Sequence, residues 1–152
     1  LHRMHHADLE FDVTTGIRFH PLSVLLSALI KLTVVVAIGP APVAVLIFEV
    51  ILNMTSLFNH SNLNIPYIAE RSLRFLVVTP DMHRVHHSSN SSESDRNFGF
   101  NFPWWDHLFG SYQGQPGAGH HDMQIGLQQF REERELRLGR LLTQPFRGNA
   151  AD

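Results

Sequence analysis

The sequence predicts an all-α protein: an integral membrane helical hairpin with a cytoplasmic helical cap whose helices are rich in histidine. Three observations predict this fold. Two long apolar segments lie next to each other, separated by the break Gly39-Pro40-Ala41-Pro42. Positive charges flank this pair of segments but are absent from the break. The pattern H-x-x-H-H occurs twice, once before the pair and once after it.

The two apolar segments have the composition of membrane helices. Leu22–Ile38 has 17 residues with Lys31 as its only charge, and Ala41–Phe58 has 18 residues with Glu49 as its only charge. At a rise of about 1.5 Å per residue, each helix is about 26 Å long, close to the roughly 30 Å hydrocarbon core. The glycine and prolines between them form a turn. A buried hairpin in a soluble α-helical protein is the alternative, because both segments are short for a span.

The charges around the hairpin predict its orientation. Arg3 and Arg18 precede it, and Arg71 and Arg74 follow it. The positive-inside rule then places both ends in the cytoplasm. Both histidine motifs therefore lie at the same membrane face, although they are far apart in the sequence.

Lys31 and Glu49 lie nine residues on either side of Pro40, so an antiparallel hairpin holds them at similar depth. A charge at mid-bilayer is costly and is usually paired. We therefore expect the two side chains to face each other or a common polar cavity. The alternative is that each extends toward the interface or faces another helix.

Each H-x-x-H-H copy directs three imidazoles toward one spot, because positions i, i+3 and i+4 share a helix face. Imidazole is the commonest protein ligand for zinc, iron and copper. Two identical copies favour one shared metal site over two unrelated surface patches. His60 follows the second apolar segment at the same membrane face and is a further expected ligand, with a helix-end role as the alternative. The expected metal ligands are His2, His5, His6, His60, His83, His86 and His87.

Residues near these histidines indicate how they are held. Thr79 as N-cap, Pro80 and Asp81 predict a helix that begins at Pro80 and carries the second motif. Asp8 and Asp81 are expected to orient imidazole N–H groups, although a helix-capping role would also explain Asp81. Asn64 is a weaker candidate, through a bound water. Surface or interface packing is expected for the remaining histidines, which are His20, His107, His120 and His121.

Two later segments have a distinct composition. Phe98–Phe109 is rich in aromatic side chains, which suits the membrane interface or, equally, packing beneath the metal site. Phe130–Leu142 contains many charges and several leucines and is predicted to be one surface helix.

Composition limits the chemistry that is available. The chain has 152 residues, enough for one domain, and no cysteine, so thiolate ligands are excluded. The net charge of −2 gives no case for nucleic acid as a partner. Seven histidines are too many for one tetrahedral zinc ion and suit part of a two-metal site. Two iron ions at a membrane face, with zinc as the substitute metal, would suit O2-dependent attack on a C–H bond of a lipid.

The order of the motifs along the chain is itself a pattern. H-x-x-H-H is followed by a hydrophobic hairpin, a lone histidine in Asn59-His60-Ser61-Asn62, the run T-P-x-M-H-x-x-H-H and the element W-D-x-L-F-G-x-Y from Trp105 to Tyr112. From residue 1 to about residue 146, this order resembles the fatty acid hydroxylase/sterol desaturase superfamily. Asp12–Pro21 is also similar to the bacterial sterol-desaturase-like branch.

This resemblance implies an integral, multi-pass membrane oxidoreductase. It implies that the seven histidines bind two iron ions at the cytoplasmic face, with O2 as co-substrate. A membrane lipid would be hydroxylated or desaturated, with electrons from an external donor. No catalytic residue beyond the metal ligands is predicted.

The resemblance also implies more sequence upstream. Members of the superfamily carry an earlier H-x(3–4)-H motif, and nothing precedes Leu1 here. We therefore expect residues 1–146 to be the C-terminal portion of a longer membrane domain and residues 147–152 to be a flexible tail. The function then belongs to the intact parent protein, and the chain alone is not expected to hold the full centre.

Two other functions compete with the oxidoreductase. One is a non-catalytic membrane metal-binding protein, which would favour more polar residues within the spans. The other is a zinc-dependent hydrolase, which needs a positioned carboxylate base. The sequence has no H-E-x-x-H motif and no evident pairing of that kind.

Overall fold

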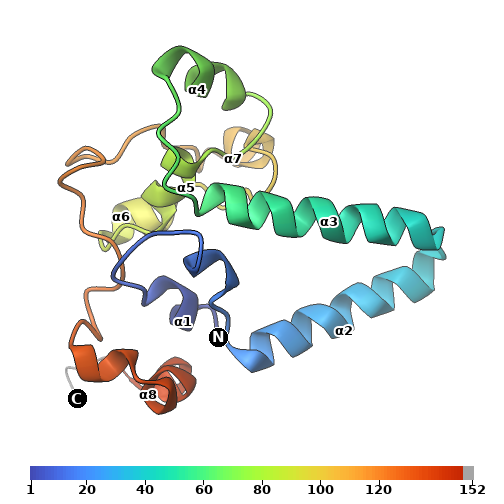
Figure 1. The fold of residues 1–152 in the computed structure, drawn as a ribbon, viewed down its shortest axis with the longest axis horizontal. Helices are drawn as coiled ribbons and strands as arrows, with labels where there is room; N and C mark the ends of the chain where they lie inside the picture. Colours follow the sequence, from blue (N-terminus) through green and yellow to red (C-terminus); the bar gives the residue numbers. More distant parts are fainter. Residues whose placement is uncertain (149–152) are drawn as a thin grey trace.

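The computed structural model describes residues 1–148 of the chain. Within that range the regular secondary structure is helical, with a single isolated bridge between Ser88 and Ile125. Two long helices project from a cap of short helices (Figure 1). The predicted all-α class and the helical hairpin are therefore confirmed.

The long helices are α2 (Pro21–Ile38) and α3 (Pro42–Asn59), each within one residue of its predicted bounds. Proline occupies the first turn of both helices, where its missing N–H costs nothing. Gly39 ends α2 in the left-handed conformation, at φ 65°, which glycine adopts without strain. His20 begins α2, because its Nδ1 accepts a hydrogen bond from the Leu22 N–H at 3.1 Å. This histidine therefore acts as a helix cap.

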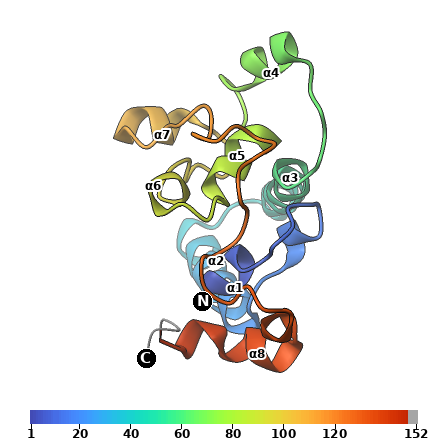
Figure 2. The same cartoon turned by 90° about the vertical axis from the view of Figure 1, so that its left-hand side faces the viewer.

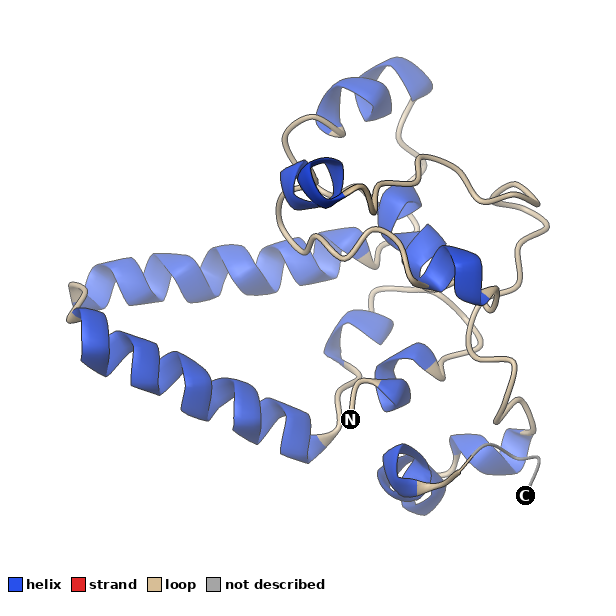
Figure 3. Cartoon of the chain, turned by 180° about the vertical axis from the view of Figure 1, so that it is seen from behind, coloured by secondary structure: helices blue, strands red, loops and turns tan. Residues whose placement is uncertain are grey.

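Both long helices are apolar enough to cross a membrane, and their side chains are not covered by the rest of the described chain. None of the α2 span and 11% of the α3 span is buried. The two helices meet at the turn and separate toward the cap, as seen from both sides (Figures 1 and 3). A hairpin buried in a soluble core would show the opposite exposure. The Lys31 Nζ lies 2.5 Å from the Glu49 Oε1, which confirms the expected pair.

The cap is built from short helical segments that hold the histidine motifs in its middle. Seen along the hairpin (Figure 2), α1 and α5 lie between α4 at one end and α8 at the other. The cap elements are α1 (Arg3–His6), η1 (Thr15–Ile17), α4 (Tyr67–Leu73), α5 (Pro80–His86), α6 (Ser91–Ser94), α7 (Trp104–Phe109), η2 (Glu133–Leu136), α8 (Leu138–Thr143) and η3 (Gln144–Phe146).

The interior of the cap has few apolar residues for a folded domain. Several of them lie on or beside α1 and α5, and α5 packs against α3. The buried apolar side chains are Met4, Ala7, Phe11, Val78, Met82, Val85, Phe130 and Leu141. Much of the remaining interior is occupied by histidine and other polar side chains, so the core and the candidate site overlap.

The helix predicted over residues 130–142 is wrong. The segment instead forms η2 and α8, separated by extended backbone at Arg137 with ψ 140°. The break accompanies the burial of Glu135, which pairs with Arg147 and lies 3.8 Å from Arg140. A pattern of charges and leucines does not reveal which acid turns inward. Of the expected tail, residues 147–152, Arg147 makes this contact, and residues 149–152 lie outside the described part.

Candidate metal centre

The seven expected ligands lie together where α1, α5 and the end of α3 meet. They form two groups, and within each group one nitrogen per histidine lies within 4.8 Å of the others. We name them by their exposure. The buried group is His5, His60, His83 and His87, and the open group is His2, His6 and His86.

The two motifs are interleaved between the groups in a reciprocal way. The buried group takes the i and i+4 histidines of the second motif, His83 and His87, and the i+3 histidine of the first, His5. The open group takes the i and i+4 histidines of the first motif and the i+3 histidine of the second. The expectation that each motif points to one spot was therefore wrong. Positions i+3 and i+4 point in directions about 100° apart around a helix. Where two groups of histidines adjoin, this difference is enough to place the two imidazoles in different groups.

Local sequence explains how α5 presents its histidines. The Thr79 Oγ accepts a hydrogen bond from the Met82 N–H at 3.4 Å, and Pro80 occupies the first helical position. The helix therefore begins where the sequence predicts, one turn before His83. His60 follows the last residue of α3 and caps its C-terminal end.

The buried group has nitrogen spacings that suit one metal ion. The His60 Nε2 lies 3.2 Å from the His5 Nε2 and 3.0 Å from the His83 Nε2. The His60 Nδ1 lies 2.7 Å from the Ser56 carbonyl, which only accepts, so Nδ1 carries the hydrogen and Nε2 presents its lone pair. Metal–imidazole distances of about 2.0–2.1 Å imply spacings of roughly 3.0–3.4 Å between neighbouring ligand nitrogens.

His87 gives a second sign that this group fits a metal. Its side chain is 1% exposed, and neither ring nitrogen has a hydrogen-bond partner in the described chain. Buried polar atoms in proteins nearly always have a partner. Aromatic rings pack against the group. The ring of Phe19 stacks on that of His5 with 4.7 Å between centroids, and the ring centroids of Phe11 and His87 lie 5.2 Å apart. An ion bound here would satisfy a nitrogen that the protein leaves unpaired.

The open group has fewer histidines and more access. His2 is exposed, His6 is partly exposed and His86 is 9% exposed. The His86 Nδ1 donates to the Arg96 carbonyl at 2.9 Å, which leaves its Nε2 free to bind a metal. The rings of His6 and His87 stack at 4.4 Å, so the two groups adjoin.

A cavity of about 540 Å³ reaches the open group. Its lining includes His2 of the cap, Lys31 of α2 and Leu52 of α3, so it lies between the cap and the two long helices. Apolar side chains such as Ile17, Val24 and Leu52 form much of its wall. Its contents can therefore approach His2 of the open group.

Burial keeps all seven imidazoles neutral at physiological pH. Desolvation is the main cause in every case, and neighbouring histidines add to it in most. The pKa falls to about 4 for His2, to about 3 for His5 and to about 2 for His6. The pKa values of the other four are also lowered. Neutral imidazole is the form that binds metal.

The expected carboxylate contacts are wrong. Asp8 pairs with Arg18 at 2.7 Å, and Asp81 pairs with Arg84 at 2.8 Å and lies 4.0 Å from His120. Both carboxylates are thus engaged away from the seven histidines. The main-chain carbonyls of Ser56 and Arg96 hold the imidazoles instead. Sequence reasoning missed them because every residue has a carbonyl.

Sequence reasoning also missed Gly16. The Ser56 Oγ donates to the Gly16 carbonyl at 3.0 Å, and a Cβ at Gly16 would lie 3.1 Å from the His60 Nδ1. The backbone of η1 thus packs directly against a candidate ligand. Asn64 is exposed and lies outside both groups, as do His20, His107, His120 and His121.

Comparison with known proteins agrees with this geometry. The family model described as fatty acid hydroxylase matches residues 1–111, which include all seven histidines. The chain is 30% identical over 125 residues to ornithine lipid hydroxylase OlsE of Rhizobium tropici. The aligned residues are 82% of this chain and 37% of that protein. No solved structure matches the chain. The chain therefore belongs to the fatty acid hydroxylase family.

Proposed function

We propose that the protein is a membrane oxidoreductase that hydroxylates a lipid, with two iron ions bound by the seven histidines. The observation that carries the proposal is the meeting of these histidines, from three separate segments, in two adjoining groups. Membership of the fatty acid hydroxylase family supports it. The chain spans 37% of the length of its relative, so the activity of the whole protein is part of the proposal.

The two groups suit different tasks. Four buried imidazoles would hold one ion in an enclosed site, whereas three imidazoles beside a cavity would hold the other where further ligands can approach. When bound, the iron ions would supply the activation of O2 and the transfer of one oxygen atom to a C–H bond. The Ser56 and Arg96 carbonyls fix the orientation of one imidazole in each group, His60 and His86.

The cavity beside His2 supports a lipid substrate. Its apolar wall suits an acyl chain and excludes water from the neighbourhood of the open group. We further propose that the hairpin spans the membrane with both ends in the cytoplasm, which puts the centre at the cytoplasmic face. An external donor would then supply electrons there. The similarity to an ornithine lipid hydroxylase favours hydroxylation over desaturation.

The competing functions have less support. A zinc hydrolase needs a carboxylate base near the metal, and within residues 1–148 the two groups contain histidine alone. A non-catalytic metal-binding protein would need no apolar cavity at the open group. Neither alternative explains why two adjoining histidine groups and an apolar cavity occur together in a member of this family.

Metal content and O2 uptake test the proposal directly. We expect the full-length protein, expressed with iron available, to bind about two irons per chain and to consume O2 when lipid and reductant are present. His86→Ala should remove iron and activity together, because a ligand is lost. His121→Ala, at an exposed residue outside both groups, is the matched control and should change neither. One tightly held zinc without O2 uptake, or full activity in His86→Ala, would refute the proposal.

A further inference from the structure

Helix α4 has its polar and apolar sides reversed relative to a helix on a water-facing surface. Its inward side chains are charged: Glu70 is 6% exposed and pairs with Arg74. Its outward side chains include two large apolar or aromatic ones, Tyr67 at 72% and Ile68 at 82% exposure, beside the exposed Arg71 and Ser72. Burying charge while exposing apolar surface is unfavourable in water.

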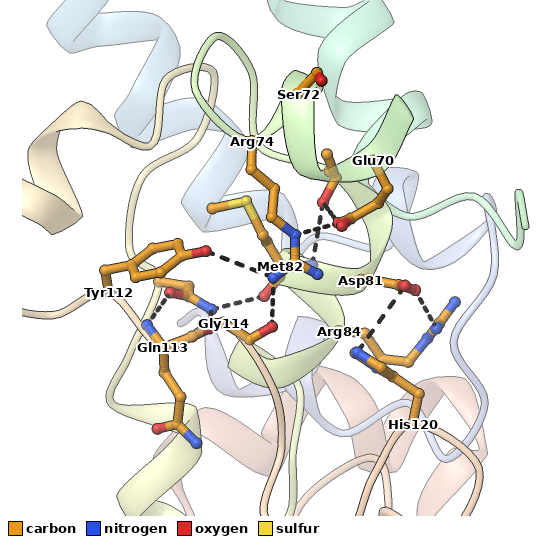
Figure 4. Close-up of polar contacts among 12 residues, drawn as sticks. Glu70, Ser72, Arg74, Asp81, Met82, Arg84, Tyr112, Gln113, Gly114 and His120 are labelled. Carbon is orange, nitrogen blue, oxygen red and sulfur yellow. Dashed lines mark hydrogen bonds and ion pairs between the residues drawn. The ribbon is translucent and has the colours of Figure 1, made fainter. Parts of the chain in front are cut away.

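The buried side of α4 makes several polar contacts. The Thr79 Oγ donates to the Glu70 Oε1 at 2.7 Å, and the Arg74 Nη1 donates to the Gly114 carbonyl and approaches the Tyr112 hydroxyl at 3.5 Å. Figure 4 shows the side chains of Glu70 in α4 and of Arg74, which follows the helix, pointing toward each other, with the Tyr112 hydroxyl facing Arg74. The hydrogen bonds and the ion pair of Glu70 and Arg74 therefore fix which side of α4 faces the interior.

Helix α7 shows the same reversal. Asp106 is 1% exposed and accepts hydrogen bonds from the backbone N–H groups of Phe98 and Gly99, both at 2.8 Å. The outward residues of α7 are large and apolar. They are Trp104, Trp105, Leu108 and Phe109, all more than half exposed.

The two reversed helices form one surface. The Trp104 Nε1 donates to the Phe75 carbonyl at 2.6 Å, which joins α7 to the residues that follow α4. Phe75 and Leu76 are themselves exposed. We define the apolar surface as Tyr67, Ile68, Phe75, Leu76, Phe102, Trp104, Trp105, Leu108 and Phe109.

This apolar surface lies beside the base of the hairpin. Trp105 and Phe109 line a cavity of about 540 Å³ together with Phe48 and Leu52 of α3. In Figure 1, α7 lies beside the cap end of α3, and α4 lies above it. The surface therefore continues the exposed apolar surface of α3 sideways, at the level where a spanning helix would leave the bilayer.

We propose that α4 and α7 are interfacial helices that rest in the same leaflet that the hairpin enters. Their aromatic side chains would lie among the headgroups and upper acyl chains, where Trp and Tyr are favoured. Arg71, exposed on the same side of α4, would lie at headgroup level. This contact holds the cap against the bilayer and does not depend on the reaction that the centre performs.

The position of the two tryptophans makes the proposal measurable. Trp104 and Trp105 are the only tryptophans of the chain, and both belong to the apolar surface. The full-length protein, with every tryptophan outside residues 1–152 replaced by phenylalanine in all variants, would be reconstituted in phosphatidylcholine vesicles that contain lipids brominated near the headgroup end of the acyl chain. We expect the lipid bromines to quench the tryptophan emission and acrylamide in the water to quench it weakly. Trp105→Phe should remove much of the bromine-sensitive emission.

Introduced probes extend the test to α4 and provide controls. In the Trp104→Phe/Trp105→Phe background, a tryptophan at Ile68 should be quenched by the lipid bromines. A tryptophan at Glu133, exposed in η2, should respond to acrylamide alone, and one at Val36 in α2 reports insertion of the hairpin. Bound metal in each variant confirms that the cap has folded.

Each outcome decides the question. Quenching by lipid at Ile68 and Trp105 together with Val36 supports the interfacial contact. Quenching at Val36 alone overturns it. Acrylamide quenching at Trp105 would then mean that the surface faces water, and protection from both quenchers would mean that another segment or a second copy covers it. Loss of O2 uptake with intact quenching would refute the proposed function and leave this contact standing.

Discussion

The buried and open groups of histidines differ in burial although they derive from two copies of one motif. In the buried group, all four imidazoles are enclosed, and His87 has no hydrogen-bond partner in the described chain. In the open group, His2 is exposed and lines the cavity. The difference comes from the surroundings, because η1, Phe11 and Phe19 cover the buried group and nothing equivalent in the described chain covers His2.

This comparison separates holding a metal from using it. A closed set of four nitrogens retains an ion and fixes its position, whereas an open set leaves positions at which O2 and substrate can approach. The stacked rings of His6 and His87 place the two groups next to each other. Because the cavity reaches His2, we propose that the reaction takes place at the open group and that the buried group anchors it.

The largest expected effect comes from removing one ligand from each group. His83→Ala should empty the buried group and lower activity by at least ~100-fold, because a ligand of the enclosed ion is lost. It should also lower the free energy of unfolding of the metal-free protein by about 1–3 kcal/mol, since a buried side chain is removed. Iron content, O2 uptake and denaturant unfolding check these expectations.

His2→Ala is the matched variant at the open group. We expect it to keep the iron of the buried group, about one per chain, and to lose most of the activity. Its exposed position should make the stability change small, within about 0.5 kcal/mol. If His2→Ala lost both irons while His83→Ala kept one, the assignment of anchor and reaction side would be reversed.

The next effect is a loss of stability in acid. The unfolded chain binds protons on its histidines below about pH 6.5, whereas the folded pKa values are lowered, to about 3 for His5 and about 2 for His6. The unfolded state then holds more protons, so the metal-free protein loses stability as the pH falls from 6.5 toward these values. Thermal unfolding between pH 8 and pH 4 would show this, and bound iron should move the loss to lower pH. A flat profile would mean that the imidazoles are solvated.

Asp106 is expected to act on the open group alone. It holds the N–H groups of Phe98 and Gly99, next to the Arg96 carbonyl that orients His86. Asp106→Asn leaves one of these donors without an acceptor, which should cost about 1–3 kcal/mol of stability. Release of the Arg96 carbonyl should weaken iron binding at the open group by roughly 10–100-fold.

A control distinguishes this from general loosening. Ser111→Ala removes a third donor to the Asp106 carboxylate, at 2.6 Å, but leaves both backbone contacts in place. We expect it to lose less stability and to keep the affinity of the open group. Equal loss of iron from both groups in Asp106→Asn would contradict a local role.

Much of the fold, and which histidines come together, were predictable because their signals are local. The hairpin follows from two apolar runs and a proline-rich break, and α5 begins at Pro80 because capping chemistry acts within one turn. The seven histidines stand out through repeated spacing. Belonging to the fatty acid hydroxylase family was also predictable, since the motif order is specific.

The division into groups was not predictable. His5 and His6 are neighbours in sequence and belong to different groups, as do His86 and His87. A helix turns by about 100° per residue, so the partner of each imidazole depends on how α1 and α5 face each other. The pattern of residues on one helix does not contain that tertiary relation. The carbonyls of Ser56 and Arg96 were hidden for a related reason, because their role depends on where the backbone passes.

The smallest expected effect is at the pair in the hairpin. Lys31 lines the cavity that also reaches His2, and the side chains of Lys31 and Glu49 remain about one third exposed. Lys31→Met/Glu49→Leu removes both charges, so the double variant should differ in stability by about 1 kcal/mol or less, while Lys31→Met alone leaves a charge unpaired and should cost more. Iron content should be unchanged in both, because neither residue contacts a histidine group. The KM for lipid should change with kcat nearly constant, since the cavity serves the open group by holding substrate. A loss of iron from the buried group in the double variant would show that the hairpin and that group are coupled, and would end the distinction between anchor and reaction side.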